Sequence, residues 1–127
     1  MKADETNRFT PRFDADGLIT VVVEDATTAE TLMVAHANGE AIRMTLQTGV
    51  AHFWSRSRGE LWRKGATSGN ELAISEVRVD CDQDVLLYRV RVTGDRVACH
   101  TGRRSCFYRS LSSDGESLAF VDERSDG

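Results

Sequence analysis

The sequence has no apolar run long enough to cross a membrane. Its longest, the LITVVV stretch at residues 18–23, has the length of a β-strand, whereas a spanning helix needs about 20 apolar residues. The opening residues, MKADETNRF, contain no apolar stretch behind Lys2, so they do not read as a secretory signal. We therefore expect a cytoplasmic protein with no membrane partner.

Proline and cysteine are also scarce. The one proline, Pro11, precedes the part expected to fold, and no repeat, low-complexity tract or linker divides the 127 residues. We predict a single domain over residues 1–127, with about 1–14 and 112–127 peripheral. The three cysteines form no CxxC pair, which excludes a zinc finger or ribbon. In a reducing cytoplasm such thiols serve more often as ligands or nucleophiles than as disulfides.

A broad positive field is missing as well. The formal net charge is −4, and the chain contains two short basic clusters at residues 55–69 and 99–109, each with a local charge of +3. Non-specific nucleic-acid binding usually needs an extended basic surface, so we expect no nucleic-acid partner. Two compact clusters suit a small anionic ligand better.

What the sequence does contain is a series of short β-rich segments. Residues 17–25 are rich in valine, and residues 31–37 return antiparallel to them after a polar break. Further short strands are expected at residues 50–55, 60–64, 73–80, 85–92, 105–111 and 117–122. The predicted fold is mainly β (α+β): a single-domain twisted sheet or half-open barrel with one main helix.

The helix is predicted at residues 38–49, NGEAIRMTLQTG. Asn38 can cap its N-terminus, and Gly49 stands where a helix ends. Between them, Ile42 and Leu46 share a face, four residues apart. This is the one clear helix of the chain.

The segment DCDQD, residues 80–84, places one thiol among three carboxylates. If the preceding strand continues through it, Asp80, Asp82 and Asp84 face away from Cys81, because strand side chains alternate. Carboxylate oxygens suit Mg2+ and a thiolate suits a softer metal such as zinc, so one segment would serve two metal sites. The alternative is a solvated acidic turn with an incidental thiol.

The other two thiols, Cys99 and Cys106, bracket the segment CHTGRRSC. Three thiols supply three zinc ligands and leave a fourth position open, which is the pattern of catalytic zinc sites. Zinc lowers the pKa of a bound water to about 7 and so provides a hydroxide nucleophile. His100 would then be a further ligand, a proton shuttle or a hydrogen-bond partner of a ligand. The alternative is three unrelated reduced cysteines.

The loop WSRSRGELWRKGATSG, residues 54–69, alternates guanidinium, hydroxyl and glycine residues. Arginine binds phosphate through two hydrogen bonds, and glycine beside serine or threonine lets backbone N–H groups approach phosphate oxygens. A tryptophan can stack on a base, although a tryptophan in a strand more often belongs to the core. The candidate substrate- and phosphate-binding residues of both basic clusters are Arg56, Ser57, Arg58, Trp62, Lys64, Thr67, Ser68, Gly69, Arg103 and Arg104.

Together these segments resemble the phosphoribosyl-AMP cyclohydrolases of histidine biosynthesis, from about Gly17 to Arg109. The resemblance rests on HFWSRSRGELWRKGATSG, DCDQD and CHTGRRSCFYR, in that order and at family-like separation. It implies an enzyme that hydrolyses the N1–C6 bond in the adenine ring of phosphoribosyl-AMP and forms the formimino-carboxamide ribotide. It also implies an intertwined homodimer with its sites at the subunit interface.

The resemblance implies two cofactors and their ligands. Zn2+ would be held by the three cysteines and Mg2+ by the three aspartates of residues 80–84. His100 and His52 are then the candidates for the catalytic acid or base that delivers a proton to N1. The zinc ligands are Cys81, Cys99 and Cys106, and the magnesium ligands are Asp80, Asp82 and Asp84.

Some positions depart from the commonest pattern of that family. Asn70 stands where a histidine is frequent, and His36 and Ala37 stand where tyrosine and methionine are frequent. The chain ends without the fused pyrophosphohydrolase domain of some members, so we expect it to perform one step only. Two alternatives remain open: a paralogue acting on a related purine nucleotide, and a zinc-stabilised module that binds a phosphorylated ligand without turnover.

Overall fold

The computed structural model describes residues 5–65, 69–93, 99 and 102–121. These residues form one α-helix and eight β-strands. In chain order the elements are β1 (Ile19–Asp25), β2 (Thr31–Ala37), α1 (Gly39–Thr48), β3 (His52–Ser55), β4 (Glu60–Arg63), β5 (Leu72–Val79), β6 (Val85–Val92), β7 (Arg109–Leu111) and β8 (Leu118–Phe120).

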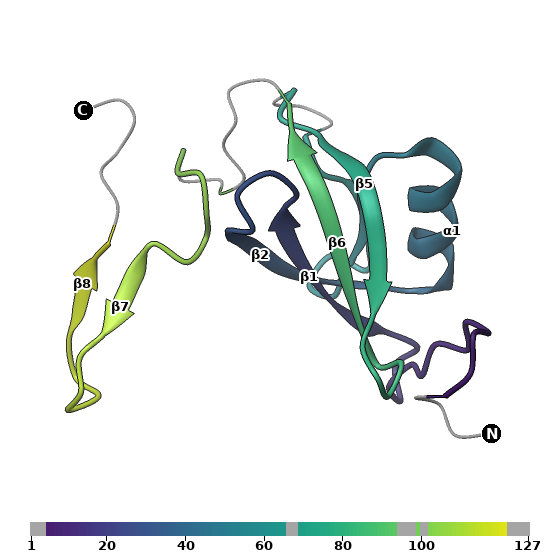
Figure 1. Ribbon diagram of the computed structural model, residues 1–127, viewed down its shortest axis with the longest axis horizontal. Helices are drawn as coiled ribbons and strands as arrows, with labels where there is room; N and C mark the ends of the chain where they lie inside the picture. Colours follow the sequence, from purple (N-terminus) through teal and green to yellow (C-terminus); the bar gives the residue numbers. More distant parts are fainter. Residues whose placement is uncertain (1–4, 66–68, 94–98, 100–101, 122–127) are drawn as a thin grey trace.

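Four strands form the main sheet in the order β2-β1-β6-β5 (Figure 1). β1 runs parallel to β6, whereas the β1–β2 and β5–β6 pairs are antiparallel. β3 pairs with β4, and β7 with β8, in two smaller sheets. The prediction of a mainly β fold with one helix is confirmed, and the described strands form open sheets rather than a closed barrel.

The predicted helix is confirmed with both of its caps. Asn38 Oδ1 accepts a hydrogen bond from the backbone N–H of Ala41 at 2.8 Å, which satisfies a free donor of the first turn. Gly49 adopts a left-handed conformation, and its N–H donates to the Thr45 carbonyl. α1 has 10 residues, and the described part of the chain contains no helix long and apolar enough to span a membrane.

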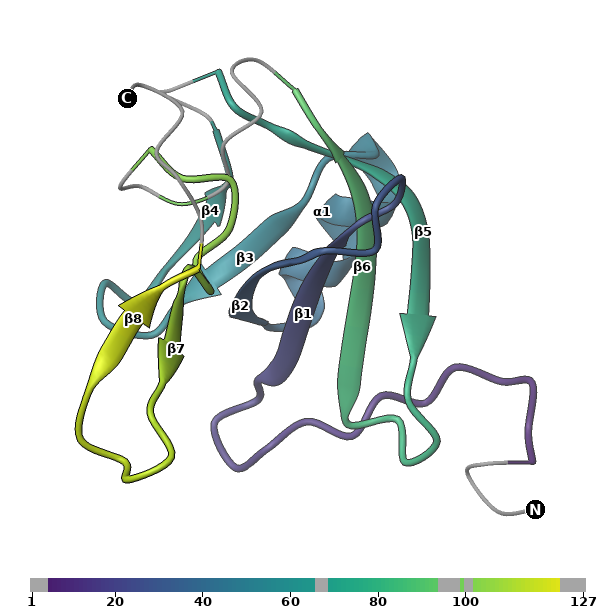
Figure 2. The ribbon, with the colours of Figure 1, turned by 60° about the vertical axis from the view of Figure 1, so that its left-hand side comes forward.

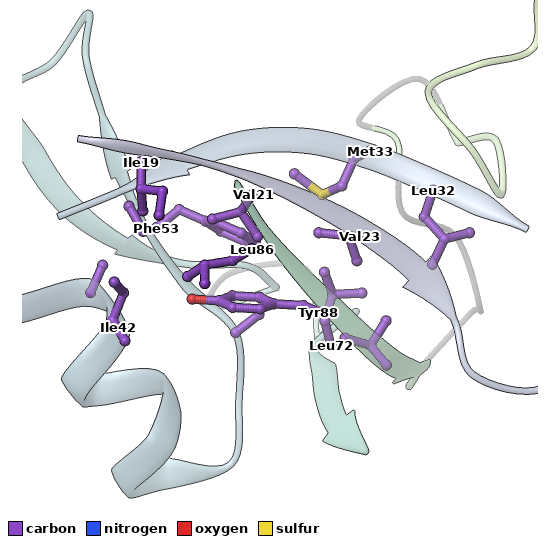
Figure 3. Close-up of a cluster of buried hydrophobic side chains, with 14 residues drawn as sticks. Ile19, Val21, Val23, Leu32, Met33, Ile42, Phe53, Leu72, Leu86 and Tyr88 are labelled. Carbon is purple, nitrogen blue, oxygen red and sulfur yellow. The ribbon is translucent and has the colours of Figure 1, made fainter. Parts of the chain in front are cut away.

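The core lies between the main sheet, α1 and β3 (Figure 3). Alternating residues of β1 and β6 point into it, because a half-buried strand places every second side chain on the core face. Phe53 of β3 sits at the centre, with its ring 4.9 Å from that of Trp62 and 5.9 Å from that of Tyr88. The fully buried large side chains are Ile19, Val21, Val23, Leu32, Phe53, Leu72, Leu86, Tyr88 and Val90.

Two expectations about strands were wrong in their extent. β5 ends at Val79, so the alternation expected through Asp84 stops before the acidic residues begin. β7 starts only at Arg109, because the residues before it are tied differently to the edge strand β2. There the Ser105 hydroxyl donates to the Thr31 carbonyl at 2.6 Å and the Cys106 N–H donates to the Leu32 carbonyl at 2.7 Å.

The two ends of the chain are arranged in different ways. The N-terminal segment runs below the main sheet and passes the turn between β5 and β6 (Figure 2). The hairpin of β7 and β8 projects away from the sheet on the opposite side of the molecule from α1 (Figure 1). The backbone of Arg8, Thr10 and Arg12 is hydrogen-bonded to Gln83 in this turn.

Candidate metal and nucleotide site

The acidic segment forms the turn of the β5–β6 hairpin. Asp80 Oδ1 accepts the backbone N–H groups of Asp84 at 3.0 Å and Val85 at 3.1 Å, so this side chain closes the turn. Gln83 adopts a left-handed conformation with φ of 58°, which reverses the chain direction. The aspartates therefore belong to a turn and not to the face of a strand, and within the described chain their three side chains do not form a cluster that could hold a metal ion.

The carboxylates of this turn influence each other. Partial burial alone would raise the pKa of Asp80, but hydrogen bonds from the Val85 N–H, the Asp84 carboxyl group and the Asp84 N–H hold it below its usual value. The pKa of Asp84 is raised, first by its hydrogen bond to Asp80, then by burial, and then by the charges of Asp80 and Asp82. A bound cation would relieve this repulsion, so the charge of the turn suits Mg2+.

Gln83 is a structural residue of the turn that sequence reasoning missed. It is almost fully buried, with an exposed fraction of 3%. Its Oε1 accepts the Thr10 N–H at 2.7 Å, its Nε2 donates to the Arg8 carbonyl at 3.2 Å, and its carbonyl accepts the Arg12 N–H at 2.7 Å. The signal in the sequence was a glutamine that, apart from Cys81, is the one uncharged residue of the run DCDQD.

Cys99 and Cys106 lie together. The Cys106 side chain forms a hydrogen bond with the Cys99 side chain, and the Cys99 N–H donates to the Arg103 carbonyl at 3.0 Å. Burial, then the charge of and the hydrogen bond to Cys99, raise the pKa of Cys106 to about 11, and Lys64 opposes this rise. Cys106 is exposed as a residue, but protein atoms partly surround its thiol, and this burial is the main reason for the raised pKa. Two adjacent thiols are a partial ligand set for zinc.

Cys81, exposed in the hairpin turn, does not join them. Cys106 is anchored to Leu32, which stands in a bulge of β2 between Thr31 and Met33, and these two residues lie level with Arg89 and Tyr88 of β6. That level is three to four residues along β6 from Val85, or roughly 10–13 Å, and β2 lies two strands away, or roughly 10 Å. Zinc–sulfur bonds are only about 2.3 Å long. One chain therefore brings two of the three thiols together, and no cluster of three metal-binding side chains occurs among the described residues.

The first basic cluster begins in the turn between β3 and β4. The Arg58 N–H donates to the Ser55 hydroxyl at 3.2 Å, and the Arg58 guanidinium lies 3.4 Å from the Glu60 carboxylate on the surface. Ser57 and Arg56 occupy the same turn, exposed to solvent. Trp62, in β4, packs on Phe53 at the edge of the core. The turn at residues 56–58 is therefore accessible to a ligand, whereas the Trp62 ring packs partly against the core.

Gly65, which follows Lys64, lies in close contact with the backbone of Asn70. Gly65 has φ of +84°, and a Cβ atom there would lie 2.4 Å from the carbonyl carbon of Asn70. The Gly69 N–H donates to the Gly65 carbonyl at 2.8 Å, which closes the loop between them. Asn70 is buried next to it. The predicted ligand residues Thr67 and Ser68 lie outside the described residues.

The two arginines of the second cluster differ in their contacts. The guanidinium carbon of Arg103 lies 4.2 Å from the centre of the Tyr108 ring and 4.9 Å from that of Phe120, both cation–π distances. Arg104 instead forms an ion pair of 2.9 Å with Glu30 and a longer one of 3.9 Å with Asp25. Arg103, whose carbonyl accepts the Cys99 N–H, is the better placed of the two for an anion near the thiols.

The histidines also differ in their surroundings. His52 is buried in β3, its Nδ1 lies 2.8 Å from the Val50 carbonyl, and its backbone N–H donates to the Thr45 hydroxyl at 2.9 Å. These contacts make it part of the packing between β3 and α1. His100 lies outside the described residues. His36 is partly buried in β2, and this burial, followed by the Arg56 charge, lowers its pKa.

The sequence was compared with protein families and with curated proteins. A sequence model of the phosphoribosyl-AMP cyclohydrolase family matches residues 33–108. The phosphoribosyl-AMP cyclohydrolase of Sphingopyxis alaskensis is 60% identical over 124 residues, covering 98% of this chain and 96% of that protein. The proteins of the same name from Brucella anthropi and Brucella canis are 58% and 60% identical over 120 and 118 residues. These alignments cover 94% and 93% of this chain and 85% of each relative.

Proposed function

The chain belongs to the phosphoribosyl-AMP cyclohydrolase family and is a hydrolase, and on that premise we propose that it opens the adenine ring of phosphoribosyl-AMP in histidine biosynthesis. Water adds across the N1–C6 bond: its oxygen goes to C6 and a proton goes to N1, which yields the formimino-carboxamide ribotide. The observation that carries the proposal is the pair of adjacent thiols, Cys99 and Cys106, with the Lys64 charge close by.

Zinc would be held by the two adjacent thiols of one chain and by Cys81 of a second copy. Thiolates are preferred zinc ligands, and three of them leave the fourth position open for chemistry. The separation of Cys81 from the other two thiols within one chain supports a homodimer with the site at the interface. When bound, zinc would act as a Lewis acid and lower the pKa of a water molecule that it binds.

Magnesium would be held by the carboxylates of Asp80, Asp82 and Asp84. The pKa of Asp84 is raised by its hydrogen bond to Asp80, by burial and by the charges of Asp80 and Asp82, and a cation beside the turn would offset these negative charges. Because Asp80 Oδ1 closes the turn and the Asp84 carboxyl group is hydrogen-bonded to Asp80, Asp82 would be the most accessible of the three ligands. The magnesium ion would sit in the same turn as Cys81, so the two metals would meet at one interface.

The chain's own side chains then bind and orient the substrate. The Lys64 charge acts on Cys106, and the Arg103 carbonyl accepts the Cys99 N–H, so both residues lie close to the thiol pair and their charges suit a phosphate. The Arg56–Arg58 turn offers a second anion-binding position on the surface. We assign proton delivery at N1 to His100, which directly follows Cys99, because His52 is engaged in packing.

The loss of phosphoribosyl-AMP, followed by absorbance in the purified protein, tests the proposal. We expect turnover that a chelator abolishes and that added Zn2+ with Mg2+ restores. AMP and a second purine nucleotide serve as controls for the substrate. Turnover of another nucleotide in preference would indicate a paralogue. A zinc-loaded dimer that binds phosphoribosyl-AMP but leaves its absorbance unchanged would be a binding module, and the proposal would be wrong.

A further inference from the structure

The edge strand β2 has a bulge near its start, and this bulge holds the segment that carries Cys106. The pairing of β1 with β2 skips Leu32, which is therefore an extra residue on the β2 side. An edge strand leaves carbonyl groups without a partner strand. Here the Leu32 carbonyl accepts the Cys106 N–H at 2.7 Å, and the Thr31 carbonyl accepts the Ser105 hydroxyl at 2.6 Å. The chain that leads into β7 accordingly passes close to β2 (Figures 1 and 2).

The Ser105 hydroxyl makes two hydrogen bonds in a place that solvent hardly reaches. Ser105 is exposed by only 5%. Its hydroxyl donates to the Thr31 carbonyl and accepts the Phe107 N–H at 2.9 Å, which is a local side-chain-to-backbone turn around Cys106. Without the hydroxyl, a carbonyl of β2 and an N–H next to Cys106 would both lose their partner, and such losses are costly when the groups are buried.

The neighbouring Arg104 is also attached to the start of β2, but more loosely. Its guanidinium lies 2.9 Å from the Glu30 carboxylate, and the two side chains are exposed by 56% and 40%. An ion pair in contact with water contributes little, because solvent screens it and two long side chains lose their freedom. The buried hydroxyl of Ser105 is therefore the main attachment of this segment, together with the backbone bond of Cys106.

This attachment determines where the thiol of Cys106 lies. The Cys106 side chain is hydrogen-bonded to that of Cys99, whose own N–H is held by the Arg103 carbonyl. The two thiols thus meet only if Cys106 keeps its place on β2. We propose that Ser105 is a positioning residue, whose buried hydroxyl fixes Cys106 on the bulge of β2 so that the two thiols can bind one zinc ion together.

The inference rests on the proposed zinc site, but it concerns a residue that touches neither substrate nor metal. Groups that hold a metal ligand in place typically change metal affinity by about 10–100-fold when they are removed. A residue that only stabilised the fold would change the unfolding temperature without a matching change in metal affinity.

Four variants separate the hydroxyl from the size of the side chain. Ser105→Ala removes the hydroxyl. Ser105→Thr and Ser105→Val have the same shape, but only threonine keeps the hydroxyl, so a difference between these two comes from the hydrogen bonds. Ser75→Ala is the control, because Ser75 is an exposed serine of β5, at the other edge of the main sheet. Thermal melts by circular dichroism show whether each variant is folded.

The first measurement is the transfer of zinc from the full-length, zinc-loaded protein to the chromogenic chelator 4-(2-pyridylazo)resorcinol. We expect Ser105→Ala and Ser105→Val to bind zinc about 10–100-fold more weakly than the wild type, with Ser105→Thr and Ser75→Ala close to it. The kcat should fall with the zinc content, and the KM of the zinc-loaded fraction should not change. Equal zinc affinity in Ser105→Thr and Ser105→Val would overturn the inference.

A second measurement needs no zinc. Phenylarsine oxide bridges two adjacent thiols: two As–S bonds form, and the two thiol protons leave with the oxygen of the arsenical as water. In metal-free protein that carries Cys81→Ser, this probe can bridge only Cys99 and Cys106. We expect it to bind about tenfold or more weakly when Ser105→Val is added than when Ser105→Thr is added. Equal binding would show that the hydroxyl does not hold the two thiols together.

The two measurements separate this inference from the proposed function. A wild-type protein that turns over phosphoribosyl-AMP, while the threonine and valine variants bind zinc and the arsenical equally well, keeps the function and loses the role of Ser105. A protein in which the arsenical binds as expected, but which does not turn over the substrate, keeps the role of Ser105 and loses the function.

Discussion

Gln83 and Thr10 are joined by a hydrogen bond of 2.7 Å between the Gln83 Oε1 and the backbone N–H of Thr10, across 73 residues of sequence. The bond ties the N-terminal segment to the turn that carries Asp80, Cys81, Asp82 and Asp84. A loose turn would present its thiol and carboxylates in many positions. The hydrogen bonds of Gln83 to the N-terminal segment, called the clamp below, therefore restrict the positions that the thiol and carboxylates of this turn can take.

Replacing Gln83 tests the clamp. Gln83→Gly keeps a residue that tolerates the left-handed conformation but removes both side-chain hydrogen bonds. We expect it to lower the free energy of unfolding by about 1–3 kcal/mol and to increase hydrogen exchange in residues 5–12. Thr10→Ala is the control, because only the backbone of Thr10 takes part. Unchanged exchange in Gln83→Gly would show that the clamp does not hold the segment.

Gly65→Ala should disturb the loop in which Thr67, Ser68 and Gly69 are expected to bind phosphate. Its Cβ would lie 2.4 Å from the backbone of Asn70, whereas a Cβ at Gly17, which has a similar positive φ of +76°, meets nothing within 4 Å. Gly17→Ala thus carries the backbone strain alone, and Gly65→Ala carries the strain and the clash. We expect the KM for phosphoribosyl-AMP to rise at least tenfold in Gly65→Ala, with about a 1–3 kcal/mol loss of stability from strain in both variants. Equal KM values in the two variants would contradict the role of the loop.

Asp82→Asn should separate the two metals. Asp82 is exposed in the turn and makes none of the hydrogen bonds that close it, so the fold and the zinc content should persist. Activity that depends on Mg2+ should be lost, because an amide is a weaker ligand for a hard cation than a carboxylate. Metal analysis and a magnesium titration of kcat measure this, with Asp16→Asn as the control in another surface turn. A parallel loss of zinc would mean that one site and not two is present.

Replacing each of the two candidate histidines should have a different effect, on kcat for His100 and on stability for His52. His100→Ala should lower kcat by about 10²–10⁴-fold, with KM and unfolding temperature nearly unchanged, because it removes the side chain to which we assign proton delivery. His52→Ala should mainly lower the unfolding temperature, because it leaves a cavity between β3 and α1 and removes a contact with Val50. A large fall in kcat for His52→Ala without loss of stability would reverse the two assignments.

Local signals in the sequence predicted much of the fold. Asn38 and Gly49 marked α1 correctly, because each supplies the specific contact that a helix end requires. The valine-rich strands were equally clear, since β1 and β6 alternate between core and surface along their length. The ends of the strands could not be predicted as well, because an aspartate can end a strand or continue it. At Asp80 the side chain closes a turn, and this shortened the predicted strand.

The site was harder to predict because its parts are far apart within one chain. The sequence grouped Cys81 with Cys99 and Cys106 by chemical type, but nothing in their spacing placed Cys81 at the other end of β6. Neither did it show that Arg104 pairs with Glu30, a contact between two distant segments. Long-range pairing, and not residue type, decides which candidates meet.

The central claim is that the zinc site needs thiols from two chains. Cys81→Ser and Cys106→Ser homodimers should both be inactive, because every site then lacks one ligand. When the two variants are unfolded, mixed in equal amounts and refolded with zinc, half of the dimers should be mixed. Each mixed dimer has one complete site, so about a quarter of the wild-type activity and zinc content should return. No recovery, in a mixture shown by mass spectrometry to contain mixed dimers, would contradict the claim.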